Sequence, residues 1–319
     1  MYKSDVEGLD AFVNHYNALK EEVSKAIVGQ ENVIKQVLIS IFSKGHCLLV
    51  GVPGLAKTLL VSTIADVLGL SFSRIQFTPD LMPSDIIGAE ILDSNRNFKF
   101  IKGPLFANII LADEINRTPP KTQAALLEAM QEQSVTIAGM SNELPQPFFV
   151  LATQNPIEQE GTYPLPEAQL DRFMFNIWVD YPSYDEELNI VKTTTGNSVT
   201  KLNNVISKDE IVYFQNLIRK MPVPDNVLEY AVGLNTRTRP GLSSSPELIK
   251  KYISWGAGPR SSQYLIIGAK CHAAICGKYA PDIEDVKAVA EPILRHRMVR
   301  NYIAEAEGFT IEKIISEIL

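Results

Sequence analysis

Residues 47–58 combine the residue types that hold a nucleoside triphosphate. An apolar run ends at Gly51, and Lys57 and Thr58 then open an amphipathic segment. A strand, a short loop and a helix N-terminus in that order offer backbone N–H groups and a positive helix end to phosphate oxygens. Lys57 would reach the β- and γ-phosphates, and the Thr58 hydroxyl would bind Mg²⁺. Ala56 stands where the usual loop has a second glycine, so the loop alone leaves an ordinary strand and helix start as an alternative.

A second apolar run, residues 109–112, ends in two carboxylates, Asp113 and Glu114. In phosphate-loop enzymes an acid at this place holds the Mg²⁺ shell, and an adjacent acid can polarise the attacking water. The two acids could instead be an N-cap pair before the next helix. Their distance from the loop leaves room for one intervening βα unit, which favours the catalytic interpretation. The two segments together predict that the chain binds ATP with Mg²⁺.

Three further polar residues stand where a nucleotide site could use them. Asn155 directly follows a buried run, and its amide could orient the attacking water beside Glu114, although Asn-Pro also makes an ordinary turn. Arg172 precedes another predicted strand and could serve the γ-phosphate of a neighbouring subunit, or pair with Asp171 at the surface. Arg260 follows Gly-Pro at the start of a long helix, where a simple helix-start turn is the alternative.

These residues must be positioned by a mostly parallel sheet, because buried strands alternate with helices through the first part of the chain. Beyond residues 180–184 only helical periodicity remains. The sequence therefore predicts a three-layer α/β core over residues 1–182 and an all-α domain over residues 183–319. Hairpins are expected at 86–106 and at 134–148, turning near Gly139. Strands are expected at 47–50, 71–78, 108–112, 148–153 and 173–179, and helices at 10–25, 33–41, 122–132, 211–219, 227–234, 262–279, 283–291 and 311–318.

Composition narrows the class of protein. The chain has 319 residues, of which 45% are hydrophobic, and a formal net charge of −7, which disfavours a surface that binds nucleic acid throughout. No segment predicts a membrane-spanning helix, and the N-terminus lacks the apolar stretch of a signal peptide. Three cysteines are too few for a disulfide framework and fit a reducing cytoplasm. Cys271, His272 and Cys276 could suggest a metal site, but core packing is favoured because no second ligand pair follows.

A basic cluster near the C-terminus consists of Arg295, His296, Arg297 and Arg300. It could face nucleic acid, lie on a solvated helix face, or form salt bridges between lid and core. The hairpin around Gly139 has no Lys or Arg between residues 135 and 150, whereas the other hairpin carries Arg96, Lys99 and Lys102. The hairpin around Gly139 thus argues against a nucleic-acid motor, which the cations of the other hairpin keep as an alternative.

The chain resembles the AAA+ ATPases and, within them, the MoxR family. MoxR-like loops commonly carry Gly-Leu-Ala-Lys-Thr, so Ala56 supports the resemblance. The segments that carry it, beyond the loop and the acids, are 27–30, 78–85, 103–106, 112–117, 152–156, 165–173 and 258–260. The two predicted hairpins match the helix-two insert and the hairpin before the first sensor of that clade.

The resemblance implies a core and lid that clamp ATP with Mg²⁺ at subunit boundaries. Glu114 would be the catalytic base, Asn155 the first sensor, Arg260 the second sensor, and Arg172 an arginine finger supplied in trans. Thr58 and Asp113 would be the residues around the metal ion. Nucleotide binding would fall to Ile27, Val28, Gly29, Gly51, Val52, Pro53, Gly54, Leu55, Ala56, Lys57, Thr58 and Leu59.

The resemblance also implies a hexameric ring that matures or remodels protein complexes, together with a partner bearing a von Willebrand factor A domain. The same clade contains magnesium-chelatase motor subunits and nucleic-acid motors, and both stay alternatives. The client protein and the pore-facing residues are not encoded in any of these motifs.

Overall fold

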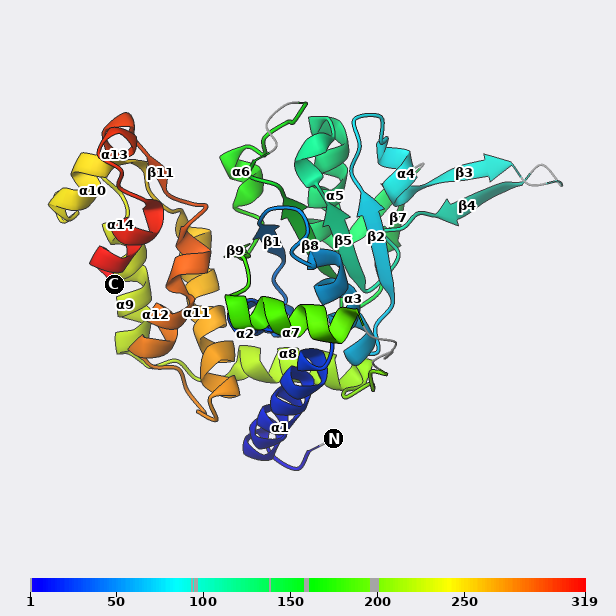
Figure 1. The fold of residues 1–319 in the computed structure, drawn as a ribbon, viewed down its shortest axis with the longest axis horizontal. Coiled ribbons are helices and arrows are strands. Elements are labelled where there is room, and N and C mark those ends of the chain that lie inside the picture. Colours follow the sequence, from blue (N-terminus) through cyan, green and yellow to red (C-terminus); the bar gives the residue numbers. More distant parts are fainter. Residues whose placement is uncertain (1, 93, 95–96, 138, 158–160, 196–200) are drawn as a thin grey trace. The chain divides into compact units, whose positions relative to one another are not determined.

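The computed structural model describes residues 2–319 except 93, 95–96, 138, 158–160 and 196–200 (Figure 1). The chain divides into two compact units. One, here the lid unit, comprises residues 1–16, 167–176 and 213–319, and the other, the sheet unit, comprises residues 17–166 and 177–212. The division falls inside helices α1 (Asp5–Ser24) and α8 (Lys208–Lys220) and inside strand β9 (Phe175–Trp178).

A five-stranded sheet in the order β2-β5-β8-β1-β9 forms the centre of the sheet unit. The pairs β2–β5, β5–β8 and β1–β8 are parallel, with Gln76 opposite Asp113, Ala112 opposite Ala152, and Val50 opposite Gln154. This in-register pairing brings the carboxyl ends of β1, β5 and β8 to one edge. The strands are β1 (Cys47–Val50), β2 (Phe72–Gln76), β5 (Ile109–Asp113) and β8 (Phe149–Gln154).

Buried strands explain why helices must cover both faces of this sheet. Every residue of β8 up to Thr153 is buried, as are the first four residues of β5. Such strands lack a solvated face and read as continuous apolar runs, which is the pattern of a sheet between helical layers. Helices of this unit are α2 (Glu31–Phe42), α3 (Lys57–Val67), α4 (Pro83–Ile87), α5 (Pro120–Glu132) and α7 (Tyr184–Thr194), with the 3-10 turn η1 (Ile115–Arg117) after β5.

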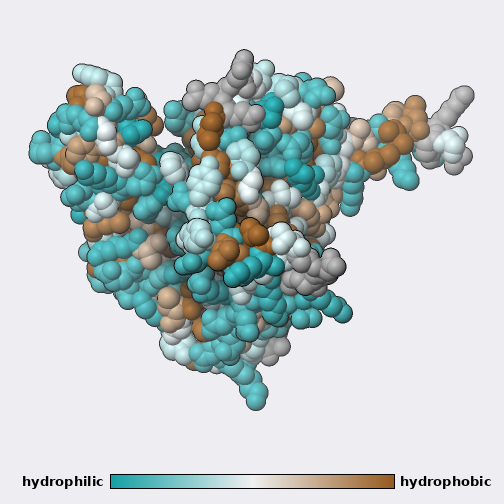
Figure 2. Space-filling model, in the orientation of Figure 1, coloured by the Kyte–Doolittle hydropathy of each residue, from teal (hydrophilic) through white to brown (hydrophobic). Residues whose placement is uncertain are grey.

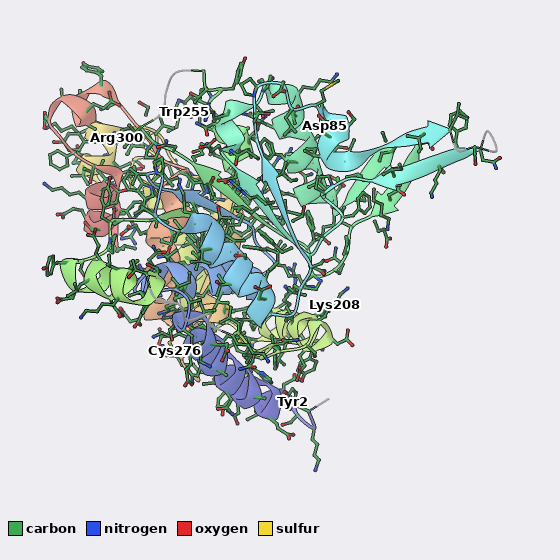
Figure 3. The ribbon with its side chains drawn as sticks, turned by 45° about the vertical axis from the view of Figure 1, so that its right-hand side comes forward. Tyr2, Asp85, Lys208, Trp255, Cys276 and Arg300 are labelled. Carbon is green, nitrogen blue, oxygen red and sulfur yellow. The ribbon has the colours of Figure 1, made fainter. Side chains whose placement is uncertain are left out.

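Two antiparallel hairpins interrupt the α/β pattern, as predicted. Strands β3 (Gly88–Leu92) and β4 (Phe98–Lys102) form an arm that carries apolar side chains on its surface (Figure 2), among them Leu92 and Phe98. Asp85, labelled in Figure 3, is the third residue of α4, just before this arm, and accepts the Met82 N–H at 2.8 Å. The middle of this predicted hairpin lies largely outside the described residues, as does Arg96. Strands β6 (Ser134–Ile137) and β7 (Met140–Glu143) form the second hairpin.

The lid unit is helical, as predicted, except for one small sheet that hydropathy patterning missed. Strands β10 (Ile253–Trp255) and β11 (Val299–Arg300) pair antiparallel, and Figure 3 labels Trp255 and Arg300 on them. Two or three residues are too few to show a period. The helices are α6 (Glu167–Leu170), α9 (Asp225–Arg237), α10 (Glu247–Tyr252), α11 (Pro259–Ile275), α12 (Ile283–Leu294), α13 (Tyr302–Ala306) and α14 (Ile311–Ile318).

Candidate ATP site

The loop between β1 and α3 forms at the carboxyl edge of the sheet. A Cβ added at Gly51 would lie 2.7 Å from the Val179 carbonyl oxygen, so only glycine fits at this position. Ala56 is the N-cap of α3 and adopts a left-handed conformation, with φ of 52°. The free backbone N–H groups of the first turn of α3 therefore follow directly after this residue, which is the arrangement that binds phosphate.

Lys57 lies inside this loop. Its Nζ donates to the Gly51 carbonyl at 2.5 Å. Partial burial lowers the pKa of Lys57, and the charges of Asp113 and Glu114 counteract that shift. The ammonium group is thus within electrostatic reach of both acids. Thr58 follows as the second residue of α3.

The two acids are held by strands on either side of β5. The buried Thr153 hydroxyl donates to Asp113 Oδ1 at 2.6 Å and accepts the Glu114 N–H at 2.9 Å. From β2, Arg74 donates to Asp113 Oδ2 at 2.7 Å, and Gln76 donates to Glu114 Oε2 at 2.8 Å. Glu114 has φ of 57°, a left-handed backbone that turns the chain sharply out of the strand. These contacts fix the direction of both carboxylates.

Asn155 comes directly after β8, at the same edge of the sheet. Its Oδ1 accepts the Ile157 N–H at 3.2 Å, which is the side-chain-to-backbone bond of an Asx turn. Asn155 therefore does form the turn considered as the alternative in the sequence analysis, and this bond also holds its side chain at the end of the strand.

Residues 27–29 line a cavity of about 400 Å³, together with side chains of α1, α2 and α7. Gly29 has φ of 69°, and an added Cβ would collide with the carboxylate of Glu186. The Gln30 amide donates to the Leu55 carbonyl at 3.3 Å and ties this segment to the phosphate loop. Ile27, Val28 and Gly29 are thus attached to the loop, as binding of the base and the phosphates of one nucleotide would need.

Arg172 and Arg260 belong to the lid unit. Arg260 is the second residue of α11, and its Nη1 contacts Asp171 Oδ2 at 2.9 Å. Asp171 also accepts from Arg297, through Oδ1 at 2.8 Å. The Arg172 carbonyl accepts from the Tyr264 hydroxyl at 3.3 Å. Arg260 thus pairs with the immediate chain neighbour of Arg172.

Comparison with known proteins identifies the family of the chain. Residues 46–175 match the model of the ATPase family associated with various cellular activities (AAA), and residues 246–318 match the AAA lid domain. The chain is 44% identical to the chaperone MoxR1 of Mycobacterium tuberculosis over 98% of its own length and 83% of that protein. The chain belongs to the MoxR family of AAA+ ATPases.

Other relatives are also similar over most of their length. The Bacillus subtilis protein YeaC is 41% identical over 94% of this chain and 91% of its own. MoxR of Methylorubrum extorquens is 29% identical over 88% of this chain and 86% of its own. The crystal structure of a Cytophaga hutchinsonii protein assigned as an ATPase matches with a TM-score of 0.90 and 44% identity, covering 98% of this chain and 95% of that one.

The cysteines of this MoxR-family chain do not assemble a metal site. Cys271 is buried and Cys276 exposed, and His272 Nδ1 lies 2.7 Å from Asp285 Oδ1. Within the described residues no group of three or more His, Cys, Asp or Glu is placed to bind a metal ion. Nor does any helix in the described part of the chain have the length and apolar character to cross a membrane.

The basic cluster near the C-terminus makes contacts inside the lid unit. Arg295 pairs with Glu291 and Glu312, Arg297 with Asp171, and Arg300 donates to the Phe309 carbonyl at 2.9 Å. Of the interpretations left open above, salt bridging describes these residues best, but the partners belong to one unit and are not divided between lid and core.

Sequence reasoning missed the residues that support the acids and Arg172, namely Arg74, Gln76, Thr153 and Arg297. The alternation of polar residues on β2 was visible, and Arg74 and Gln76 are its polar positions nearest the carboxyl end. No local signal marked the role of Arg297, because its partners beside Arg172 lie 123 and more residues earlier in the chain.

Proposed function

We propose that this MoxR-family protein is an Mg²⁺-dependent ATPase. The single observation that carries the proposal is the convergence of Lys57, Asp113 and Glu114 at one edge of the sheet, beside a loop that ends in a helix N-terminus. Lys57 would neutralise phosphate charge, and Glu114 would accept a proton from the attacking water. Asn155, held at the end of β8, would orient that water.

The residues present fit Mg²⁺ and ATP. Thr58 and Asp113 offer hydroxyl and carboxylate oxygens, the hard donors that Mg²⁺ prefers, and each would hold the metal directly or through water. A bound Mg²⁺ would supply charge neutralisation for the phosphates. The rest of the loop, from Gly51 to Leu59, would bind phosphates, and Ile27, Val28 and Gly29 would line the adenine pocket.

The proposal places the complete site between subunits. Arg172 would act as an arginine finger in the pocket of a neighbouring copy, and Arg260 would contact the nucleotide of its own chain. An arginine finger stabilises charge in the transition state and is worth ~10³–10⁵ in rate. A closed ring, which we take to be a hexamer, gives every pocket one finger. The proposed boundary between core and lid at residue 182 lies between the two matched family segments.

Hydrolysis would drive chaperone-like maturation or remodelling of protein complexes in the cytoplasm, with a von Willebrand factor A domain protein as partner. The name of the Mycobacterium tuberculosis relative, a chaperone, supports this role. Internal pairing of Arg295, Arg297 and Arg300 argues against the nucleic-acid alternative, since those cations already have carboxylate or carbonyl partners. No contact described above favours the chelatase alternative.

A mixing experiment tests the proposal. Arg172→Ala keeps its own pocket and loses the finger, and Glu114→Gln keeps the finger and loses its own pocket. Each protein alone should be nearly inactive in Mg²⁺-dependent ATP turnover. Random mixing at equal amounts joins a competent pocket to a competent finger at about a quarter of the boundaries, so turnover should return to that level. Turnover that stays absent, while the subunits exchange, would remove the trans role of Arg172.

A further inference from the structure

One buried arginine binds the segment that carries Arg172. Arg297 is only 7% exposed. Its Nε donates to Asp171 Oδ1 at 2.8 Å, and its Nη2 donates to the carbonyls of Asp171 at 2.8 Å and Phe173 at 2.6 Å. Its Nη1 donates to the Met174 carbonyl at 3.2 Å. The guanidinium therefore contacts the residues on both sides of Arg172.

Neighbours of Arg297 complete this contact. His296 Nε2 lies 3.0 Å from the Phe173 carbonyl, and Tyr264 donates to the Arg172 carbonyl at 3.3 Å. Arg295 Nη1 reaches the Asn176 carbonyl at 3.4 Å. Three consecutive side chains that directly follow α12, with one from α11, thus hold the backbone from Asp171 to Asn176. We call this set the Arg297 clamp.

The clamp needs arginine in particular. A buried cation is tolerated only when its hydrogen bonds are made, and a guanidinium presents five donors in a rigid plane. Lysine would keep the charge but offers three donors on a single atom, and it could not reach Asp171, Phe173 and Met174 together. The Arg297 guanidinium also lies over the Tyr264 ring, 5.1 Å from its centroid, which fixes its plane further.

We infer that Arg297 is a positioning residue that sets the place of Arg172 for hydrolysis in the neighbouring subunit. This inference rests on the proposed function, in which Arg172 acts in trans. A displacement of about 1 Å in a catalytic group can cost about 10²-fold in rate. Loosening the clamp should therefore slow turnover while leaving the chain's own nucleotide pocket intact.

Mixing Arg297→Lys with each of the two reference variants tests whether Arg297 supports the arginine finger or the nucleotide pocket of its own chain. Arg297→Lys alone should turn over ATP about 10²-fold more slowly and bind ATP as the unmodified protein does. Mixed with Glu114→Gln, it should regain turnover as Arg172→Ala does, because its pocket now receives an intact finger. Mixed with Arg172→Ala, it should gain no turnover, because neither subunit supplies a correctly placed finger.

A matched control and a milder variant complete the design. Arg300→Lys changes an arginine of the same cluster whose described bonds go to Phe309 and Glu305, and it should leave turnover unchanged. Tyr264→Phe removes only the hydroxyl that bonds the Arg172 carbonyl. It should slow turnover a few-fold and fall in the same complementation group, even if Arg297→Lys folds poorly.

Four outcomes would overturn the inference. Full activity of both Arg297→Lys and Tyr264→Phe would show that the clamp does not matter. Rescue by Arg172→Ala instead of Glu114→Gln would place Arg297 in its own chain's pocket. Loss of turnover with no rescue by either partner would mean a general structural role. If the reference mixture of Arg172→Ala and Glu114→Gln also fails, the proposed trans site is wrong, and the inference falls with it.

Discussion

Asp171 Oδ2 contacts Arg260 Nη1 at 2.9 Å, while the other oxygen of the same carboxylate holds Arg297. Asp171 is also the chain neighbour of Arg172. Arg260, which we propose contacts the nucleotide of its own chain, is thus paired with Asp171. Asp171 in turn precedes Arg172, which we propose acts in the pocket of the adjacent subunit. This arrangement makes Asp171 a competitor for Arg260, because a phosphate and Asp171 cannot both take the same face of its guanidinium.

Asp171→Asn should strengthen ATP binding modestly. The substitution removes the charge that holds Arg260, while the amide oxygen can still accept from Arg297. Because the pair is partly exposed, its loss is worth roughly 0.2–1 kcal/mol, or about 1.5–5-fold in affinity. Titration calorimetry in a Glu114→Gln background would measure it without turnover. Glu305→Gln, an exposed lid acid, serves as the control, and weaker binding in Asp171→Asn would contradict the competition.

Local signals account for the parts of the site that the sequence predicted. The apolar runs before Gly51 and Asp113 and the run ending at Thr153 are strands in the structure, since strands buried on both faces carry no polar alternation. Parallel register then brings their carboxyl ends together. The predicted roles of Glu114, Asn155, Arg172 and Arg260 stay predictions, because contacts between side chains do not by themselves test catalysis.

Ion pairs between residues far apart in the chain could not be predicted from the sequence. The alternative considered for Arg172 was a surface pair with Asp171, yet Asp171 pairs with Arg260 and Arg297, which lie 89 and 126 residues away. A single charge has no period that could reveal its partner. Arg297 was grouped with its basic neighbours for the same reason, although burial makes it different from a solvated cation.

Arg74→Gln should lower the Mg²⁺ concentration needed for half-maximal turnover. Arg74 Nη2 contacts Asp113 Oδ2 at 2.7 Å, so the guanidinium and a metal ion would compete for one carboxylate. Arg74 is about half exposed, and the gain in apparent Mg²⁺ affinity should be only about 1.5–5-fold. ATP turnover measured against free Mg²⁺ gives the value. Arg117→Gln, whose partner is Glu114, is the matched control. A higher Mg²⁺ requirement in Arg74→Gln would mean that Arg74 orients Asp113 for the metal.

Ala56→Gly should stabilise the fold slightly without harming nucleotide binding. Ala56 has φ of 52°, and a left-handed backbone costs a non-glycine residue ~1–2 kcal/mol. Glycine relieves that cost but loses ~0.5–1 kcal/mol through its greater freedom in the unfolded chain. The free energy of unfolding should therefore rise by up to about 1.5 kcal/mol, as measured by chemical denaturation. Ala56→Val, which is β-branched, should lower it. An equal effect of both substitutions would show that the backbone strain is absent.

His46 should make the sheet unit sensitive to acid. This buried side chain accepts the Val150 N–H through Nδ1 at 3.0 Å and lies 3.2 Å from the Met130 carbonyl through Nε2. The neutral ring satisfies both partners, whereas a second proton on Nδ1 would face a donor. Burial lowers the pKa of His46 to about 4, from an ordinary value of 6.5.

The sign follows from these two values. Between pH 6.5 and 4 the unfolded chain binds the proton and the folded protein does not, so stability is complete above pH 6.5 and falls as the pH drops. At pH 5 the loss should be about 2 kcal/mol relative to pH 7.5. His296, whose pKa burial and Arg297 also lower, acts in the same direction.

The variant His46→Gln isolates the effect of His46. Glutamine can also donate to one carbonyl and accept one N–H, but it does not titrate in this range. The difference in the free energy of unfolding between the two proteins should therefore shrink by about 2 kcal/mol from pH 7.5 to pH 5. Denaturant titrations at several pH values, followed by a probe in the sheet unit, would measure it. A difference that stays constant over this range would mean that His46 keeps its proton count on unfolding, and that its two hydrogen bonds do not set its charge.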